Sequence, residues 1–355
     1  MGSARRERLR RQIDESRDGF LITDLADLRY LTGFSGSNGA LFISASGAEG
    51  DVFSTDGRYV EQAATQCPDL GVLVARDCVA AISAQCVAQG AEAISLDARS
   101  SVAIMVAVEQ VGLTVHLQEN PVAALRAIKD AGEISALEQA CEITSRAVDI
   151  LAVEMREGDS EIAIARRLEQ LFGELGADDR SFATIVASGE NSAKPHHEPT
   201  GKTLNAGDLL IIDCGALVRG YHADMTRTFI VGEPAPWQVD LHALVARAAE
   251  AGRRAVASGV NLADLDAAAR SVIEAAGHGE HFGHGLGHGI GLDIHEAPMI
   301  GPRAKGRLSA DTTITVEPGV YLPGRGGVRI EDSLLVTADG QRSLTSSPRD
   351  LRLVG

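Results

Sequence analysis

The strongest constraint on this chain comes from acidic and imidazole side chains embedded in apolar, β-prone runs of its C-terminal half. The residues are Asp213, Asp224, His288, Glu317 and Glu331. A strand that buries its aliphatic neighbours turns alternate side chains toward one face, so these groups are expected to meet in a shared cleft. Carboxylates brought together without cations would have to bind protons at neutral pH. The sequence therefore predicts that the fold gathers them around bound metal.

The donor set narrows the kind of metal. Carboxylate oxygens with a single imidazole suit hard or borderline ions such as Mn²⁺, Co²⁺ or Zn²⁺ better than a thiolate-preferring metal. Two divalent ions would neutralise the four carboxylates. Taken alone, an Asp near a turn or a Glu before proline is usually a cap or a solvated charge. The metal interpretation depends on all five residues occurring together.

Two hairpins are expected to carry the acids. Asp213 and Asp224 bracket a run whose midpoint is Val218-Arg219, so a hairpin turning there would set the two aspartates opposite each other. The two glutamates bracket a run centred on Gly324, and the same geometry follows.

The N-terminal part alternates short apolar runs with helical patterns, which favours an α/β layered domain. The predicted strands are 20–22, 40–43, 52–53, 72–74 and 94–96. The predicted helices are 56–64, 78–89 and 100–111. A break at Glu119-Asn120-Pro121 predicts a boundary between domains 1–120 and 121–355.

The C-terminal part repeats one order of elements. Long amphipathic helices are predicted at 133–157, 160–176, 236–258 and 262–276, with strands after each pair. Domain 121–355 is therefore interpreted as an α+β domain of two α-α-β halves.

Composition excludes some partners. The formal charge of −16 and a pI near 5.1 repel nucleic acid and anionic membrane surfaces. The five cysteines are odd in number and lack close paired spacing, which favours reduced thiols in the cytoplasm. Neither an h-region after the N-terminal arginines nor a run of about 20 apolar residues is present, so we expect no signal peptide and no membrane span.

Nearly the whole chain resembles the metallopeptidase family with the pita-bread fold, specifically its Xaa-Pro members, aminopeptidase P and prolidase. The resemblance is carried by the runs Tyr30 to Ser37, Thr55 to Tyr59, Phe182 to Gly189, His284 to His295, Glu317 to Gly319 and Arg329 to Asp332, with the Asp213/Asp224 pair. It implies an α/β N-terminal domain of the creatinase/prolidase kind. It also implies a pita-bread α+β catalytic domain with pseudo-two-fold halves.

By this resemblance Asp213 would chelate one ion, Asp224 and Glu331 would bridge two, and His288 with Glu317 would complete the second site. The cofactor implied is a pair of divalent ions, Mn²⁺ first, with Co²⁺ or Zn²⁺ as alternatives. The ions would lower the pKa of a water that attacks the scissile carbonyl. Glu317 would also carry a proton toward the leaving nitrogen.

Three further histidines match non-ligand positions of the family. His196 and His295 would hydrogen-bond the substrate and the tetrahedral intermediate, and His284 would line the proline pocket. We assign the first role to His196, which directly follows Pro195, and expect His197 to face solvent. Arg329 is grouped with the substrate-binding residues and is expected to orient a carboxylate ligand.

The implied activity is that of a metal-dependent Xaa-Pro aminopeptidase of the aminopeptidase P type, with prolidase, an Xaa-Pro dipeptidase, as the alternative. Proline-containing peptides would be the substrates, and the family expectation is a homodimer. A non-catalytic binding module would be expected to have lost ligands. A creatinase-like metal-free hydrolase would not need the five predicted ligands.

Overall fold

The computed structural model describes residues 2–14 and 16–355 of the protein. Contacts divide the chain into two compact units, Met1–Arg126 and Ala127–Gly355, so the division lies six residues beyond the boundary expected from the sequence. Each unit is described by itself. Within the described residues, no helix is both long enough and apolar enough to span a membrane.

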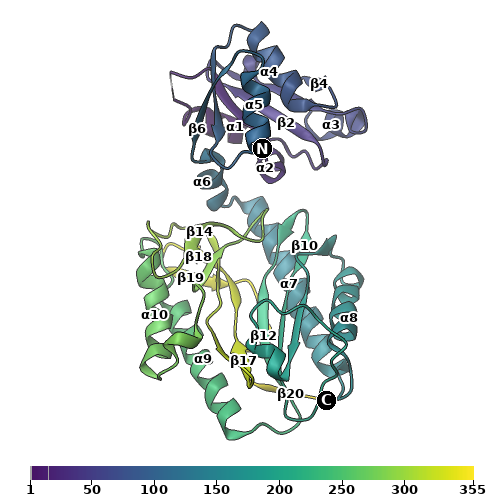
Figure 1. Ribbon diagram of the computed structural model, residues 1–355, viewed down its shortest axis with the longest axis vertical. Helices are drawn as coiled ribbons and strands as arrows, with labels where there is room; N and C mark the ends of the chain where they lie inside the picture. The colour runs from purple at the N-terminus through teal and green to yellow at the C-terminus, as the bar shows by residue number, and fades with distance from the viewer. Residues whose placement is uncertain (1, 15) are drawn as a thin grey trace. The chain divides into compact units, whose positions relative to one another are not determined.

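The N-terminal unit is built on a six-stranded sheet of order β4-β3-β2-β1-β5-β6 (Figure 1). Its strands are β1 (Gly19–Ile22), β2 (Gly39–Ser44), β3 (Val52–Thr55), β4 (Val72–Val74), β5 (Ala93–Asp97) and β6 (Thr114–Gln118). Its helices are α1 (Gly2–Arg10), α2 (Leu25–Thr32), the 3₁₀ turn η1 (Ala48–Gly50), α3 (Val60–Gln66), α4 (Cys78–Ala88), α5 (Val102–Glu109) and, at the boundary, α6 (Pro121–Ala127). The α/β class and the five predicted strands are confirmed, while β6, α1, α2 and α6 were not predicted.

One predicted helix start is wrong. The helix expected from Asp56 begins at Val60 instead. The Asp56 carboxylate accepts hydrogen bonds from the backbone N–H of Arg58 at 3.0 Å and from the Arg58 guanidinium. An aspartate that bonds the backbone two residues ahead stabilises a turn in competition with a helix.

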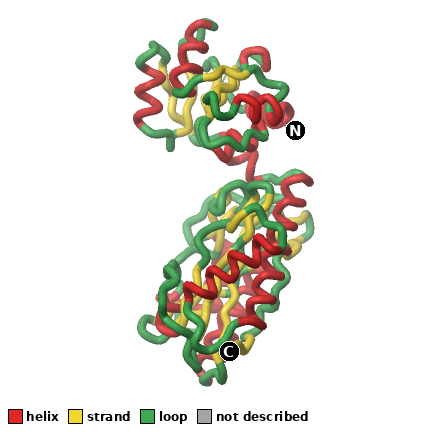
Figure 2. Tube along the Cα trace, turned by 90° about the vertical axis from the view of Figure 1, so that its right-hand side faces the viewer, coloured by secondary structure: helices red, strands yellow, loops and turns green. Residues whose placement is uncertain are grey.

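The C-terminal unit contains four long helices, and all four were predicted to within a few residues. They are α7 (Ala131–Glu154), α8 (Glu161–Glu174), α9 (Pro236–Ala255) and α10 (Leu262–Ala275). Side chains cap three of the helix starts, because Asp130, Ser160 and Asn261 accept hydrogen bonds from first-turn N–H groups. In Figure 2, which looks onto the side of α7 and α8, these helices lie in front of the strands.

The strands of this unit form four sheets, of orders β11-β10-β7, β20-β12-β9-β8, β14-β13-β15-β18-β19 and β16-β17. In the first half they are β7 (Asp179–Arg180), β8 (Ile185–Ser188), β9 (Leu209–Cys214), β10 (Ala216–Val218), β11 (Tyr221–His222) and β12 (Met225–Val231). The remaining strands are β13 (Gly287–Gly289), β14 (Glu296–Ile300), β15 (Thr313–Val316), β16 (Gly319–Leu322), β17 (Gly326–Arg329), β18 (Asp332–Thr337), β19 (Gly340–Ser343) and β20 (Arg352–Val354). Two 3₁₀ turns, η2 (Gly189–Ala193) and η3 (Gly279–His281), connect them to the rest of the unit.

Each half of the unit has its own hydrophobic core. Residues of α7, α8, β9 and β12 form one core, and residues of α9, α10, β15 and β18 form the other. The predicted repetition of an α-α-β order is therefore matched by two separate packing centres. The strands that contain or flank the predicted acids lie between the two helix pairs (Figure 1).

Candidate metal centre and substrate cavity

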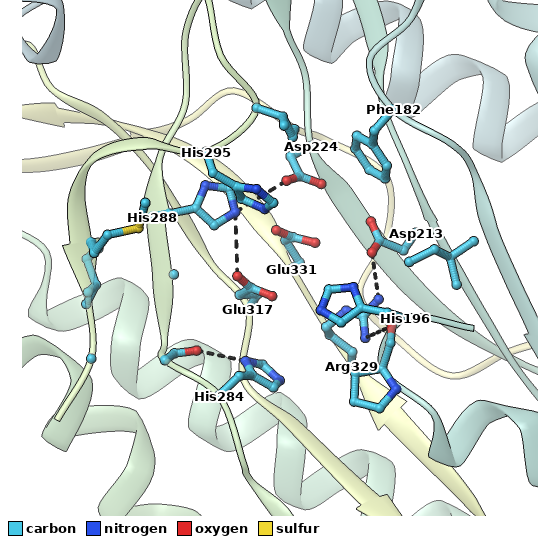
Figure 3. Close-up of a pocket in the computed structure, with 18 of the residues that line it drawn as sticks. Phe182, His196, Asp213, Asp224, His284, His288, His295, Glu317, Arg329 and Glu331 are labelled. Atoms are coloured by element: carbon cyan, nitrogen blue, oxygen red, sulfur yellow. Dashed lines mark hydrogen bonds and ion pairs between the residues drawn. The ribbon is translucent and has the colours of Figure 1, made fainter. Parts of the chain in front are cut away.

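A cavity of about 770 Å³ opens in the C-terminal unit, and every residue predicted for the site lines it. These residues are His196, Asp213, Asp224, His284, His288, His295, Glu317, Arg329 and Glu331. Figure 3 shows their side chains reaching toward one another from several strands and loops.

The hairpin predicted around Gly324 is confirmed. Strands β16 and β17 pair with Gly319 opposite Arg329, and strands β15 and β18 pair with Val316 opposite Asp332. Glu317 and Glu331 occupy the break between these two ladders, in the same register. Gly324 lies at the turn with a φ of 72°, a left-handed conformation that glycine adopts without a Cβ penalty.

The first hairpin forms, but its predicted register is wrong. Asp213 faces Thr226 rather than Asp224. The turn falls at Arg219 and Gly220, whose φ angles are 51° and 80°, instead of at 218–219. Two consecutive residues with positive φ suit the tight two-residue turn of a twisted hairpin, and this turn moves the pairing along the strands.

Both aspartates still reach the cavity because the ladder is interrupted between β9 and β10. Gly215 lies in this gap, where an added Cβ would stand 1.8 Å from the carbonyl oxygen of Ala223. Such close backbone approach requires glycine. The sequence indicated the two acids correctly but not the irregularity that positions them.

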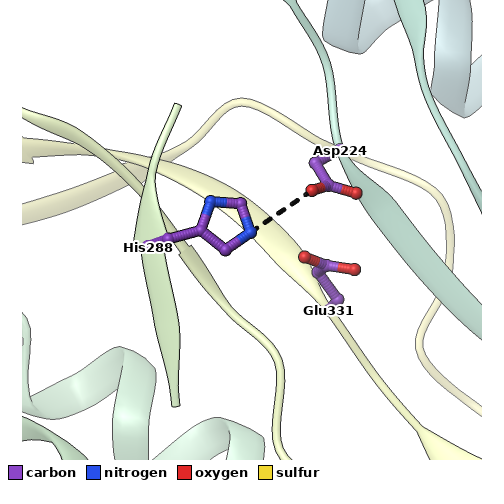
Figure 4. Close-up of side chains that lie close together, drawn as sticks. All are labelled: Asp224, His288 and Glu331. Atoms are coloured by element: carbon purple, nitrogen blue, oxygen red, sulfur yellow. Dashed lines mark ion pairs between the residues drawn. The ribbon is translucent and has the colours of Figure 1, made fainter. Parts of the chain in front are cut away.

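Three residues form a compact group suited to a cation. One ligand atom from each of Asp224, His288 and Glu331 lies within 4.8 Å of the others (Figure 4). The Nε2 atom of His288 is 3.6 Å from an oxygen of Asp224 and 3.6 Å from an oxygen of Glu317.

His288 is held in the form that a metal requires. Its Nδ1 lies 3.0 Å from the carbonyl oxygen of Gly289. A carbonyl oxygen only accepts, so Nδ1 carries the proton and Nε2 keeps a free lone pair toward the acids. Burial lowers the pKa of His288 to about 4, which keeps the ring neutral.

The acids are costly to hold together without a cation. Burial, and then the charge of Asp213, raise the pKa of Glu331 to about 8. Burial, and then the charge of Glu331, raise the pKa values of Asp224 and Glu317 well above those of ordinary carboxyls. These directions agree with the expectation that isolated carboxylates in this cleft would bind protons.

Two buried carboxylate oxygens of this site have no hydrogen-bond partner among the described residues. They are Oδ1 of Asp213 and Oε1 of Glu331. The other oxygen of Asp213 accepts from Arg329 at 2.6 Å, and the other oxygen of Glu331 accepts from Thr226 at 2.6 Å. An unsatisfied buried oxygen is unusual unless a ligand takes it, so the donor set fits divalent cations.

Arg329 connects the acids to the far wall of the cavity. Its guanidinium is buried and donates to Asp213, to the Thr226 hydroxyl and to the Tyr321 hydroxyl. The Tyr321 hydroxyl in turn lies 3.0 Å from Nε2 of His284. Burial lowers the pKa of His284 to about 4, so this histidine accepts as a neutral ring.

Tyr321 was missed by the sequence analysis. It lies on β16 four residues after Glu317, and the signal that could have indicated it was a tyrosine on a strand next to a predicted ligand.

Arg303 was missed as well. It lines the cavity and is exposed, and the structure shows no ion pair of its guanidinium with any described residue.

Of the remaining histidines discussed in the sequence analysis, two are at the cavity and one is buried against Glu161. His295 lies beside His288, with ring centroids 4.3 Å apart, and His196 is exposed at the cavity. The prediction that His197 faces solvent is wrong, because its side chain is buried and its Nε2 lies 2.9 Å from Glu161. The chain turns at Pro195 and His196, so His196 is exposed at the cavity while the His197 ring reaches the buried Glu161.

Comparisons with known proteins were made for both units. The sequence profile described as metallopeptidase family M24 matches residues 135–338, and the one described as creatinase/prolidase N-terminal domain matches residues 5–128. An Xaa-Pro dipeptidase from Pyrococcus horikoshii is 41% identical over 227 residues, which cover 64% of this chain and 65% of that protein.

The solved structures that resemble the whole chain include a dipeptidase and an aminopeptidase. The Xaa-Pro dipeptidase from Bacillus anthracis is 35% identical and covers 100% of both chains with a TM-score of 0.95. The X-Pro aminopeptidase from Thermotoga maritima is also 35% identical, with 99% of this chain and 100% of that chain covered and a TM-score of 0.89. The predicted fold class, an α/β N-terminal domain with a pita-bread catalytic domain, is confirmed by these matches.

Proposed function

Because the chain belongs to metallopeptidase family M24, we propose that this metallopeptidase hydrolyses the Xaa-Pro bond of dipeptides. The observation that carries the proposal is the cavity in which four carboxylates and His288 converge beside four further histidines. Relatives named Xaa-Pro dipeptidase support the preference for dipeptides. The sequence favoured the aminopeptidase P type, and we now place the dipeptidase first.

The metal set we propose is the one expected from the sequence. Asp213, Asp224, His288, Glu317 and Glu331 would hold two divalent ions, with Mn²⁺ as our first choice and Co²⁺ or Zn²⁺ as alternatives. When bound, such ions polarise a carbonyl oxygen and lower the pKa of water.

The chain's other polar groups are suited to bind and to transfer protons. His196 and His295 would donate to the oxygen that gains charge during attack. Glu317 would pass a proton to the proline nitrogen, which has no hydrogen of its own in an Xaa-Pro bond. His284 would contact the proline ring as a neutral side chain. Apolar residues such as Phe182 and Met299 would exclude water around the substrate.

The position of Arg303 in the cavity favours a dipeptide substrate over a longer peptide. The carboxylate of a dipeptide stands only one residue beyond the cleaved bond, so it needs a cation inside or at the rim of the same cavity. Arg303 lines that cavity without an intramolecular ion pair in the described residues. A guanidinium binds a carboxylate in bidentate geometry, whereas a longer peptide would place an uncharged peptide group there.

Several further expectations stay proposals. A homodimer and a cytoplasmic location are expected from the family resemblance and from the cysteines, all five of which are free and buried. The acidic charge argues against nucleic acid as a partner. A non-catalytic module is disfavoured because the full set of five candidate ligands converges on one cavity.

The test compares Ala-Pro with Ala-Pro-Ala, Ala-Pro-amide and Ala-Ala in the Mn²⁺-loaded enzyme. We expect Ala-Pro to be cleaved best and Ala-Ala to be cleaved poorly. Arg303→Ala should lower kcat/KM for Ala-Pro by about tenfold, the scale of one charged hydrogen bond, and should leave Ala-Pro-amide nearly unchanged.

Lys305→Ala is the matched control, because Lys305 is exposed two residues away and does not line the cavity. Faster cleavage of Ala-Pro-Ala than of Ala-Pro would restore the aminopeptidase assignment. Equal cleavage of Ala-Ala and Ala-Pro would contradict any proline specificity.

A further inference from the structure

A buried carboxylate outside the cavity holds the segment that carries His196. Glu161 is the first residue of α8, directly after the N-cap Ser160, and its side chain is fully buried. It is not among the residues that line the cavity. Its place in the fold is therefore behind the site rather than in it.

Both oxygens of Glu161 are saturated by one stretch of chain. Oε1 accepts from the backbone N–H of Ser188 at 2.9 Å, from its hydroxyl at 2.8 Å and from the amide of Asn191 at 3.0 Å. Oε2 accepts from the Thr200 N–H at 3.0 Å, from its hydroxyl at 2.7 Å and from Nε2 of His197 at 2.9 Å. The donors span the beginning, the middle and the end of residues 188–200.

The contacts require a charged acceptor. Burial alone would raise the pKa of Glu161, but the hydrogen bonds, led by those of Asn191 and His197, hold it at about 2. Every donor in the set points at the carboxylate, and an uncharged amide in its place could accept at one atom only. The carboxylate thus joins residues far apart along the segment into one rigid turn.

His196 lies inside this turn, next to one of the donors. His197 donates from Nε2 to Glu161 and also borders the cavity, which the exposed His196 lines with Pro195 and Glu198. We propose that Glu161 is a positioning residue that fixes His196 for catalysis by clamping residues 188–200 through His197 and Thr200. The inference rests on the proposed function, since it assigns His196 the role of donating to the substrate.

The same geometry excludes direct participation by Glu161. All of its acceptor positions are occupied by the chain itself, and no part of the residue reaches the cavity. Its influence on the reaction therefore passes through the orientation of His196. Groups that orient an active-site residue in this way typically change activity by about 10–100-fold when removed.

The test is a double-mutant cycle with Ala-Pro as substrate and Mn²⁺ in saturating amount. Glu161→Gln should lower kcat about 10–100-fold with little change in KM. In the His196→Ala background, the same substitution should lower kcat further by less than about twofold, because the group that it positions is gone. An equal loss in both backgrounds would overturn the proposal.

Glu169→Gln is the matched control, since Glu169 lies on the same helix at the surface and pairs with Arg180. Its activity should equal that of the wild type. Thr200→Val serves if Glu161→Gln does not fold, because it keeps the shape and the N–H while removing one donor. It should lower kcat in the wild type but not in His196→Ala, and unchanged kcat in the wild type would contradict the clamp.

The inference and the proposed function fail in different ways. If the wild type does not cleave Ala-Pro, the proposed function fails. Hydrogen exchange then tests whether Glu161 clamps residues 188–200. Faster exchange of the Ser188 and Thr200 amides in Glu161→Gln supports the clamp, and unchanged exchange overturns it. If the wild type cleaves Ala-Pro and His196→Ala retains full kcat, the role of His196 is wrong and the inference falls with it.

Discussion

At the scale of single residues, the site is defined by an imbalance of charge. Asp213, Asp224, Glu317 and Glu331 face one another, and Arg329 is the cation that hydrogen-bonds to one of them within the cavity. One guanidinium leaves most of this negative charge uncompensated. Burial, and then repulsion among the carboxylates, therefore raise the pKa values of Asp224, Glu317 and Glu331. Bound divalent cations would remove the imbalance.

We therefore expect Glu331→Gln to weaken metal binding and to stabilise the metal-free protein. The substitution removes a carboxylate that repels Asp213 and Asp224, so the metal-free variant should unfold at a temperature no lower than that of the metal-free wild type. Metal analysis after dialysis against Mn²⁺ should show a loss of more than one equivalent, because Glu331 is proposed as a bridge.

The exposed Glu190 provides the control substitution Glu190→Gln, which should leave the metal content unchanged. Retention of two equivalents by Glu331→Gln would remove this residue from the ligand set. A large destabilisation of its metal-free form would show that the carboxylate has a structural role that the repulsion argument omits.

At the scale of elements, the β16–β17 hairpin positions two of the acids. It packs against η2, where the N–H of Gly327 donates to the Ser192 hydroxyl at 2.9 Å. An added Cβ at Gly327 would lie 2.4 Å from the Ser192 carbonyl oxygen, so the hairpin and the 188–200 segment fit only with glycine here. The strand that carries Arg329 and the turn that leads to His196 are thus in direct contact.

Gly327→Ala should disturb both parts of the site. We expect a destabilisation of about 1–3 kcal/mol, the usual scale of overpacking, and a fall in kcat because the two elements separate. Urea unfolding and Ala-Pro hydrolysis measure the two effects. Gly324→Asn, at the open turn of the same hairpin, should be mild, because nothing lies near its Cβ position and Asn tolerates positive φ. Equal effects at the two positions would contradict the packing argument.

At the scale of the whole molecule, the C-terminal unit has two cores, and the cavity is lined by strands and loops from both halves.

One buried histidine, His242, affects the stability of this unit without belonging to the site. His242 on α9 is 6% exposed, and its Nε2 has no hydrogen-bond partner in the described chain. Burial lowers its pKa from 6.5 to about 4, and Asp350 only partly opposes the shift.

This group makes stability depend on pH in a defined window. The unfolded chain protonates His242 below about pH 6.5, and the folded chain does so only near pH 4. The neutral His242 ring therefore makes its full contribution to the free energy of unfolding above pH 6.5. This contribution is lost as the pH falls to 4, and its total is on the order of 3 kcal/mol.

His242→Phe should reduce the loss of stability between pH 7 and pH 4.5, measured by urea unfolding at each pH. The control is His116→Gln, on the edge strand β6 of the N-terminal unit. An unchanged pH profile in His242→Phe would show that the buried ring is not the group responsible.

The sequence by itself determined the features that depend on near neighbours in the chain. Helix starts at Asp130, Ser160 and Asn261 follow from capping chemistry, which involves residues two or three positions apart. The hairpin centred on Gly324 follows from the position of two acids and a glycine-rich turn. The apolar residues that flank the acids also indicated which acids would meet in the cavity.

Only the tertiary structure decided the contacts between distant segments. The register of the Asp213 strand depends on positive φ angles and on a strand interruption that side-chain patterns do not encode. The burial of His197 depends on Glu161, 36 residues earlier, and the contact between Arg329 and Asp213 spans 116 residues. Such pairs form because whole helices and sheets pack in one arrangement, and no local propensity or periodicity specifies which distant groups that arrangement brings together.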